Sequence, residues 1–246
     1  MTLNQIPSSH PRAKSLYIRE KLVNAFDEGL VAKEGLMAHG RGEAFDYLMG
    51  EKTSKSAKKA ILAAAFMLKN AQNPVISVNG NIAGLCPREI VLLAKKLGAK
   101  IEINLFYATE ARRRNIYKTL KKNGADQVYG MNKKNSTKLS GLDSARRIVD
   151  KFGIFSADVV IVPLEDGDRT IALKKAGKKV ITFDLNPMSR TAETADITIV
   201  DNVVRAIPLL IESCKSPKKI SFDNSKNLSL AIREIKENLS KRASNA

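Results

Sequence analysis

Short apolar runs rich in Val and Ile alternate along the chain with longer segments whose apolar residues recur at helical spacing. Short β-branched runs bounded by polar turns are typical of strands buried in a parallel sheet. They predict strands at residues 75–78, 101–105, 127–129, 159–162, 180–183 and 197–200. The helical period and its flanking Pro and Gly residues predict helices at residues 13–27, 55–69, 87–97 and 110–122.

Strands that alternate with helices predict an α/β fold, with a mostly parallel sheet of about six strands covered by helices on both faces. The first 72 residues look all-helical, so we expect three regions: a helical N-terminal region at 1–72, an α/β core at 73–214 and a polar C-terminal extension at 215–246. The extension is expected to form an amphipathic helix through Leu228, Ile232, Ile235 and Leu239. Residues 130–145 are interpreted as a surface loop, and residues 143–151 as a short helix.

Polar residues follow the last three predicted strands. In an open α/β sheet the loops after the strand carboxyl ends form the ligand crevice, so side chains in these loops should converge. Four carboxylates and two amides in one crevice indicate a polar ligand. The residues are Asp166, Asp168, Asp184, Asn186, Asp201 and Asn202, of which Asp168 and Asp201 are also suitable helix N-caps.

A glycine-rich segment in the N-terminal region, His39-Gly40-Arg41-Gly42-Glu43, is the first candidate phosphate site. If it precedes a helix, free backbone N–H groups, the helix dipole and the Arg41 guanidinium could all face a phosphate. The alternative is a glycine-rich connection with a solvent-facing arginine. A second candidate is the turn Asn79-Gly80-Asn81, which offers backbone N–H groups after the first predicted strand. Neither a GxGxxG after a strand nor a P-loop occurs.

Three further positions have two interpretations each. Asp184 could accept the ribose hydroxyls of a nucleotide, or it could only cap a helix. Arg190 and Thr191 follow the same strand and could contact the ligand, or Ser189 or Thr191 could be a cap beside a solvated arginine. Asp166, Asp168 and Glu165 could hold Mg²⁺, or Asp168 could cap a helix and pair with Arg169 or Arg205. Arg19 has the pattern of an ordinary exposed residue.

Composition narrows the function class. The chain has 246 residues, with 42 Lys and Arg against 25 Asp and Glu, for a net charge of +17. This charge suits nucleic acid or anionic small substrates, but the lysines are spread over several predicted helix faces without interleaved aromatic residues, which argues against nucleic acid. The two cysteines predict buried thiols in a reducing cytosol rather than disulfides. The start lacks an apolar signal core and no run of about 18 apolar residues occurs, so we expect a soluble cytoplasmic protein with no membrane partner.

Several long segments together resemble one family, the archaeal 4-phosphopantoate–β-alanine ligases, also called phosphopantothenate synthetases. The resemblance covers roughly residues 8–212, is weaker at 130–156, and leaves the tail after Cys214 as an extension. The segments that carry it are SHPRAKSLYIRE, GLMAHGRGEAFDYLMGEKT, NPVISVNGNIAGL, AKIEINLFYATEAR and the block from ADVVIVPLEDGDRT to ITIVDNVVRAIPLLI.

The resemblance implies a cytoplasmic homodimer with a Rossmann-like core that joins 4-phosphopantoate to β-alanine with ATP, giving 4'-phosphopantothenate, AMP and diphosphate. It places the ATP contacts on Arg19, Arg41, Asp184, Leu185, Asn186, Arg190, Thr191, Asn202 and Val203. For the phosphopantoate phosphate, the candidates are His39, Gly40, Asn79, Gly80 and Asn81, and His39 or a crevice carboxylate could accept the amine proton. The alternatives are a basic, non-catalytic nucleotide- or RNA-binding protein and a ligase for another phosphorylated hydroxy acid.

Overall fold

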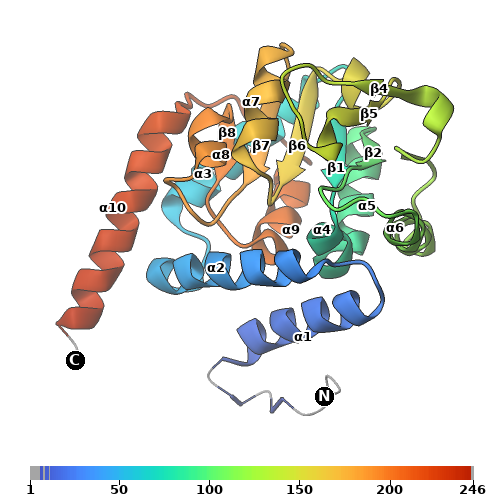
Figure 1. Ribbon diagram of the computed structural model, residues 1–246. Coiled ribbons are helices and arrows are strands. Elements are labelled where there is room, and N and C mark those ends of the chain that lie inside the picture. Colours follow the sequence, from blue (N-terminus) through green and yellow to red (C-terminus); the bar gives the residue numbers. More distant parts are fainter. Residues whose placement is uncertain (1–5, 8, 11, 245–246) are drawn as a thin grey trace.

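The computed structural model describes residues 6–7, 9–10 and 12–244, and its centre is a six-stranded parallel sheet (Figure 1). The strand order is β3-β2-β1-β6-β7-β8. In chain order these strands are β1 (Val75–Val78), β2 (Lys100–Ile103), β3 (Val128–Tyr129), β6 (Val159–Pro163), β7 (Lys179–Phe183) and β8 (Ile197–Ile199). The order runs outward from β1 in one direction and from β6 in the other, which is the doubly wound Rossmann arrangement. The predicted α/β fold is therefore confirmed.

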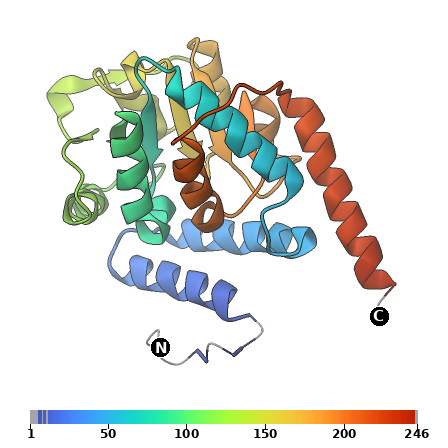
Figure 2. The ribbon, with the colours of Figure 1, turned by 180° about the vertical axis from the view of Figure 1, so that it is seen from behind.

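Helices cover both faces of the sheet because its buried strands alternate their side chains between two cores. On one face, Ile76, Ile161 and Ile181 pack with α3 (Lys55–Lys69), α5 (Pro87–Leu97) and α9 (Val203–Ser213), which Figure 2 shows side by side. On the other face lie Val75, Val160 and Val180 with α7 (Gly167–Lys175). The remaining helices are α1 (Ala13–Asp27), α2 (Lys33–Met49), α4 (Gly80–Leu85), α6 (Glu110–Lys122), α8 (Arg190–Thr194) and α10 (Asn224–Ala243).

The predicted helix at residues 143–151 is wrong. A single 3-10 turn (Ala145–Arg147) is followed by strand β5 (Ile148–Asp150), which pairs in antiparallel fashion with β4 (Ser136–Lys138) inside the predicted surface loop. The buried carboxylate of Glu102 on β2 accepts the backbone N–H groups of Asp150 and Ile154 at 3.0 and 2.6 Å. This long-range contact ties the hairpin to the sheet, and sequence periodicity does not report it.

Two helix caps differ from the predicted ones by a residue or two. Asp166, not Asp168, caps α7 by accepting from the Arg169 N–H at 2.8 Å, and Asn202, not Asp201, caps α9 through the Val204 N–H at 3.1 Å. The predicted cap Asp201 instead pairs with Arg205, which lies one turn further along α9. The carboxyl ends of β6 and β8 therefore pass directly into helix N-termini that face the same edge of the sheet.

The segment after Cys214 forms the predicted helix, but only part of its apolar stripe is buried. Leu228 is buried and Ile235 is partly buried in a small cluster, whereas Ile232 and Leu239 are 42% and 43% exposed. Glu234 accepts the backbone N–H groups of Lys55 and Ser56, which joins α10 to the start of α3. Over the ranges that the structure describes, no helix combines the length and apolar character needed to cross a membrane.

Candidate active site

A cavity of about 570 Å³ lies at the carboxyl ends of the strands. Figure 1 shows α2 crossing this edge of the sheet. The walls of the cavity come from α2 and from the segments that follow β1, β2, β6, β7 and β8. It includes the point between β1 and β6 where the strand order reverses, the usual ligand position in this fold. Of the residues singled out in the sequence, those lining it are His39, Arg41, Asn79, Gly80, Asn81, Asp166, Asp184, Leu185, Asn186, Arg190, Thr191, Asn202 and Val203.

Four of the residues singled out do not line the cavity. Gly40 is exposed on α2, and Asp168 forms an exposed ion pair with Arg190 at 2.8 Å. Asp201 is buried against Arg205. Arg19 lies on α1, where its Nε donates to both carboxylate oxygens of Glu43 at 3.0 and 2.9 Å, so within one chain it ties α1 to α2.

The glycine-rich segment at 39–43 is helical, which corrects the expected loop. These residues lie inside α2, so their backbone N–H groups are used within the helix and are not free for a phosphate. Packing of α2 against α4 and α10 overrides the weak helix propensity of its glycines. Gly42 faces the cavity next to Leu185, where an added Cβ would lie 3.5 Å from the leucine side chain. The side chain of Arg41, rather than its backbone, is what this segment offers to a ligand.

Asp184 lies across the cavity from α2, at the end of β7. Its carboxylate accepts the Asn186 N–H at 2.9 Å and a short hydrogen bond from the Ser189 hydroxyl. Burial raises the pKa of Asp184, while those two bonds and the positive charge of Arg41 act in the opposite direction. A carboxylate fixed at a strand end in this way is suited to accept hydrogen bonds from vicinal hydroxyl groups such as those of ribose. In the described part of the chain Arg41 has no carboxylate partner within ion-pair distance.

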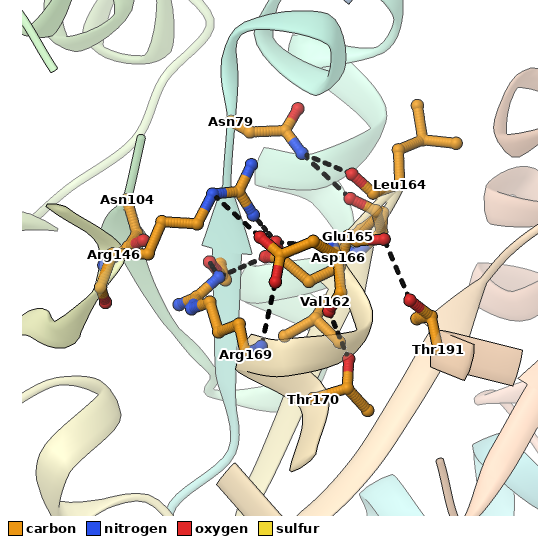
Figure 3. A network of polar contacts seen from close by, with 12 residues as sticks. Asn79, Asn104, Arg146, Val162, Leu164, Glu165, Asp166, Arg169, Thr170 and Thr191 are labelled. Carbon is orange, nitrogen blue, oxygen red and sulfur yellow. Dashed lines mark hydrogen bonds and ion pairs between the residues drawn. The ribbon is translucent and has the colours of Figure 1, made fainter. Parts of the chain in front are cut away.

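A buried network of ionic side chains supports the floor of the cavity, and the sequence analysis did not identify it (Figure 3). Glu165, which follows β6, forms ion pairs with both Arg146 and Arg169. Arg169 is fully buried and also donates to the Ser77 hydroxyl at 3.0 Å. Burial lowers the pKa of Arg146 to about 9 and that of Arg169 to about 10. The i,i+4 spacing of Glu165 and Arg169 could have predicted their ion pair. Arg146 could not be predicted in this way, because the β4–β5 hairpin brings it to the site from a distant part of the sequence.

Of the acidic residues proposed from the sequence to bind Mg²⁺, one has a suitable position in the structure. In the described ranges no three His, Cys, Asp or Glu residues form a metal-binding cluster. Mg²⁺ usually takes one or two protein carboxylates and completes its shell with phosphate oxygens and water. Asp166 fits this role best, because it lines the cavity and its Oδ2 accepts no hydrogen bond and has only the Arg146 Nε, at 3.7 Å, as an ionic neighbour. Asp168 does not fit, since it lies outside the cavity.

His39 presents an unused nitrogen to the site. Its Nε2 is buried without a hydrogen-bond partner in the described structure, and the residue lines the cavity. Burial lowers the pKa of His39, with the nearby Arg19 charge acting in the same direction and Glu43 and Asp46 opposing it. The imidazole is therefore neutral at pH 7 and able to accept a proton.

Gly80→Ala is expected to lower the free energy of unfolding by about 1–3 kcal/mol, because the added methyl group overpacks a closed space. An ideal Cβ at Gly80 would lie 2.3 Å from the Leu30 carbonyl oxygen and 2.8 Å from Arg112 Nη2. Urea unfolding followed by circular dichroism measures this change.

Gly40→Ala is the matched control, because an added Cβ there meets nothing within 4 Å. Within a helix that substitution should raise the free energy of unfolding by up to about 1 kcal/mol. Equal effects of the two substitutions would show that Gly80 is not required by close packing.

Comparison with known proteins gives one consistent result. A family model described as phosphopantothenate/pantothenate synthetase matches residues 56–241. A 4-phosphopantoate–β-alanine ligase of Thermococcus kodakarensis is 50% identical over 249 residues, covering 97% of this chain and 95% of the relative. The protein of the same name from Methanosarcina mazei is 47% identical over 247 residues, covering 96% of each chain. With this identity over nearly its whole length, the chain belongs to the phosphopantothenate/pantothenate synthetase family.

Proposed function

We propose that the protein joins 4-phosphopantoate to β-alanine, as the names of its relatives indicate. We further propose that it uses ATP and releases 4'-phosphopantothenate, AMP and diphosphate, as the family resemblance implies. One structural observation supports this proposal most strongly. Arg41 and Asp184 line the same cavity at the carboxyl ends of the strands, and the charge of Arg41 acts on Asp184. The nucleotide would lie at the β7–β8 end, with its ribose on Asp184 and its phosphates near Arg41 and Arg190. Asn202 and Val203, at the N-terminus of α9, face the same end.

The reaction needs two steps because a carboxylate has no adequate leaving group for attack by an amine. A carboxylate oxygen first attacks the α-phosphorus of ATP, the bond to the β-phosphate oxygen breaks, and diphosphate leaves. The amine of β-alanine then attacks the acyl carbon, an amide bond forms, and AMP leaves. Both attacking groups would meet in the same cavity, which supplies proximity.

Positive charge near the α-phosphate lowers the first barrier. The attack brings two anions together, and Arg41 and Arg190 would offset their repulsion and stabilise the departing diphosphate. Asp166 is the residue placed to hold Mg²⁺, which when bound would neutralise phosphate charge. The proposal also includes Arg19 as an ATP contact, a homodimer and a cytoplasmic location, as the resemblance implies.

His39 is the proposed base for the amine proton. Because its pKa is lowered, the acidic limb of the pH profile of kcat/KM for β-alanine should lie below pH 6.5, with His39 neutral above it. In His39→Asn that limb should disappear, and kcat should fall by about 10²- to 10⁴-fold. Steady-state rates from pH 5 to 9 measure both effects. An unchanged limb in His39→Asn would assign the proton to a cavity carboxylate instead.

The reaction itself is tested by diphosphate release from ATP. Release should require phosphopantoate, and the amide product should form only when β-alanine is added. Unphosphorylated pantoate and other phosphorylated hydroxy acids are the comparison substrates. Equal rates with another acid would indicate a different ligase of the same chemistry. Absence of diphosphate under every condition, with salt-sensitive retention of RNA, would indicate a non-catalytic binding protein.

A further inference from the structure

The cavity has a second cationic wall, at the end away from Asp184. Arg112 on α6 and Arg146 before β5 line the cavity beside the segments that follow β1 and β2. The proposed ATP contacts do not include either arginine. Burial is the largest cause that lowers the pKa of Arg146, the charge of Arg169 comes next, and the charge of Arg112 acts in the same direction. An arginine pair of this kind is stabilised when an anion binds between its members.

Arg146 is held rigidly in this wall. The residue is 8% exposed, and its guanidinium forms ion pairs with Glu165 and Asp166 beside Asn79 (Figure 3). The Glu165 carboxylate contacts its Nη1, and Asp166 Oδ2 lies 3.7 Å from its Nε, so these two carboxylates fix the guanidinium in the cavity wall.

Arg112 is held by backbone carbonyl groups rather than by an acid. Its Nη2 and Nε donate to the Leu30 carbonyl oxygen at 3.1 and 3.3 Å, and its Nη1 donates to the carbonyl oxygen of Tyr107. Glu34 is the carboxylate that raises its pKa, although burial lowers it more. In the residues that the structure describes, no carboxylate lies within ion-pair distance of Arg112. Its positive charge is therefore fixed in place but not neutralised.

The position of this arginine pair matches the dimensions of the proposed acid substrate. The Arg112 guanidinium lies against Gly80, which follows β1, and Asp184 follows β7, two strand spacings away in the sheet, or about 10 Å. In extended 4-phosphopantoate, five bonds separate the carboxyl carbon from the phosphorus, a reach of roughly 6 Å. With the carboxylate at the α-phosphate of ATP over β1 and β6, the other end of the acid reaches the wall that holds Arg112.

We infer that Arg112 and Arg146 bind the phosphoryl group of the acid substrate and thereby select the phosphorylated acid. This inference rests on the proposed function and assigns a phosphate subsite to residues other than His39 and Gly40. Arginine suits the task because its planar donors match phosphate oxygens and its charge balances the dianion. Arg146 already pairs with Glu165 and Asp166, but an acid without the phosphate leaves the charge of Arg112 without an anionic partner, which disfavours binding of that acid.

The test compares 4-phosphopantoate with unphosphorylated pantoate in Arg112→Met and Arg146→Lys. Each substitution should lower kcat/KM for phosphopantoate by about 10- to 100-fold, the usual effect of losing a charged hydrogen bond. The value for pantoate should change less than about threefold, and KM for β-alanine should not change. Arg146→Lys keeps a positive charge beside Glu165, and Arg112→Met leaves that network untouched, so at least one variant is expected to fold.

Arg113→Met and Arg147→Met are matched controls, because each is the sequence neighbour of one subsite arginine and neither lines the cavity. They should retain wild-type rates with both acids. Equal losses for the two acids in Arg112→Met, a raised KM for β-alanine alone, or no loss at all would each overturn the subsite.

Failure of the proposed function gives a different result, namely wild-type protein that releases no diphosphate with either acid. Calorimetry then decides the subsite separately. Wild-type protein should bind phosphopantoate more tightly than Arg112→Met does, and equal affinities would overturn the inference.

Discussion

Arg41→Ala is expected to reduce kcat/KM for ATP by about 10²- to 10³-fold, equivalent to about 3–4 kcal/mol of transition-state stabilisation. Arg41 extends from α2 into the cavity opposite Asp184 and has no carboxylate partner within ion-pair distance among the described residues. Its charge is therefore available to the phosphates, where negative charge accumulates as diphosphate leaves. Because this contact strengthens in the transition state, kcat should fall as well as kcat/KM.

Steady-state rates of diphosphate release measure this loss, and Lys121→Ala is the matched control. Lys121 is a basic residue near the end of α6, and its Nζ donates to the Asp126 carbonyl oxygen, away from the cavity. Its removal lowers the net charge by the same amount and should leave turnover unchanged. Near-normal turnover in Arg41→Ala would show that Arg41 does not contact the phosphates and is only a solvent-facing residue of α2.

Arg169→Met is expected to lower the free energy of unfolding by about 3–5 kcal/mol, the usual effect of removing one partner from a buried ion pair. Arg169 is fully buried, pairs with Glu165 and donates to Ser77. Its charge also lowers the pKa of Glu102, which burial raises to about 7. Without the arginine, Glu165 retains only Arg146, and a buried negative charge lacks part of its compensation.

Urea unfolding at pH 7, followed by circular dichroism, measures this change independently of any ligand. Arg190→Met is the comparison, because the Arg190–Asp168 pair is largely exposed. Its loss should change stability by less than about 1 kcal/mol. A similarly small change in Arg169→Met would mean that the network under β6 contributes little to the fold.

The sheet was predictable because its strands carry two independent signals. Val75–Val78 and the runs that became β6 and β7 are β-branched on both faces, and each ends at a polar turn. The rule that ligands lie at strand carboxyl ends then brought Asp184 and Asn202 to one edge without knowledge of any side-chain contact. The structure places both in the same cavity wall.

The sequence was less informative where tertiary contacts determine conformation. The glycines of α2 indicated a loop, but packing under the strand ends makes the segment helical, and so it offers a side chain rather than backbone N–H groups. The β4–β5 hairpin depends on Glu102, far away in the sequence, and it carries Arg146 into the site. No local pattern around Arg146 indicates that position.

The most direct test of the central claim is a crystal structure of the protein with a non-hydrolysable analogue of ATP. We expect the analogue to occupy the cavity at the carboxyl ends of β6, β7 and β8. Its triphosphate should lie within hydrogen-bonding distance of the Arg41 guanidinium, and its ribose hydroxyls should donate to Asp184. A nucleotide bound elsewhere, or one bound there while Arg41 points away from its phosphates, would contradict the account.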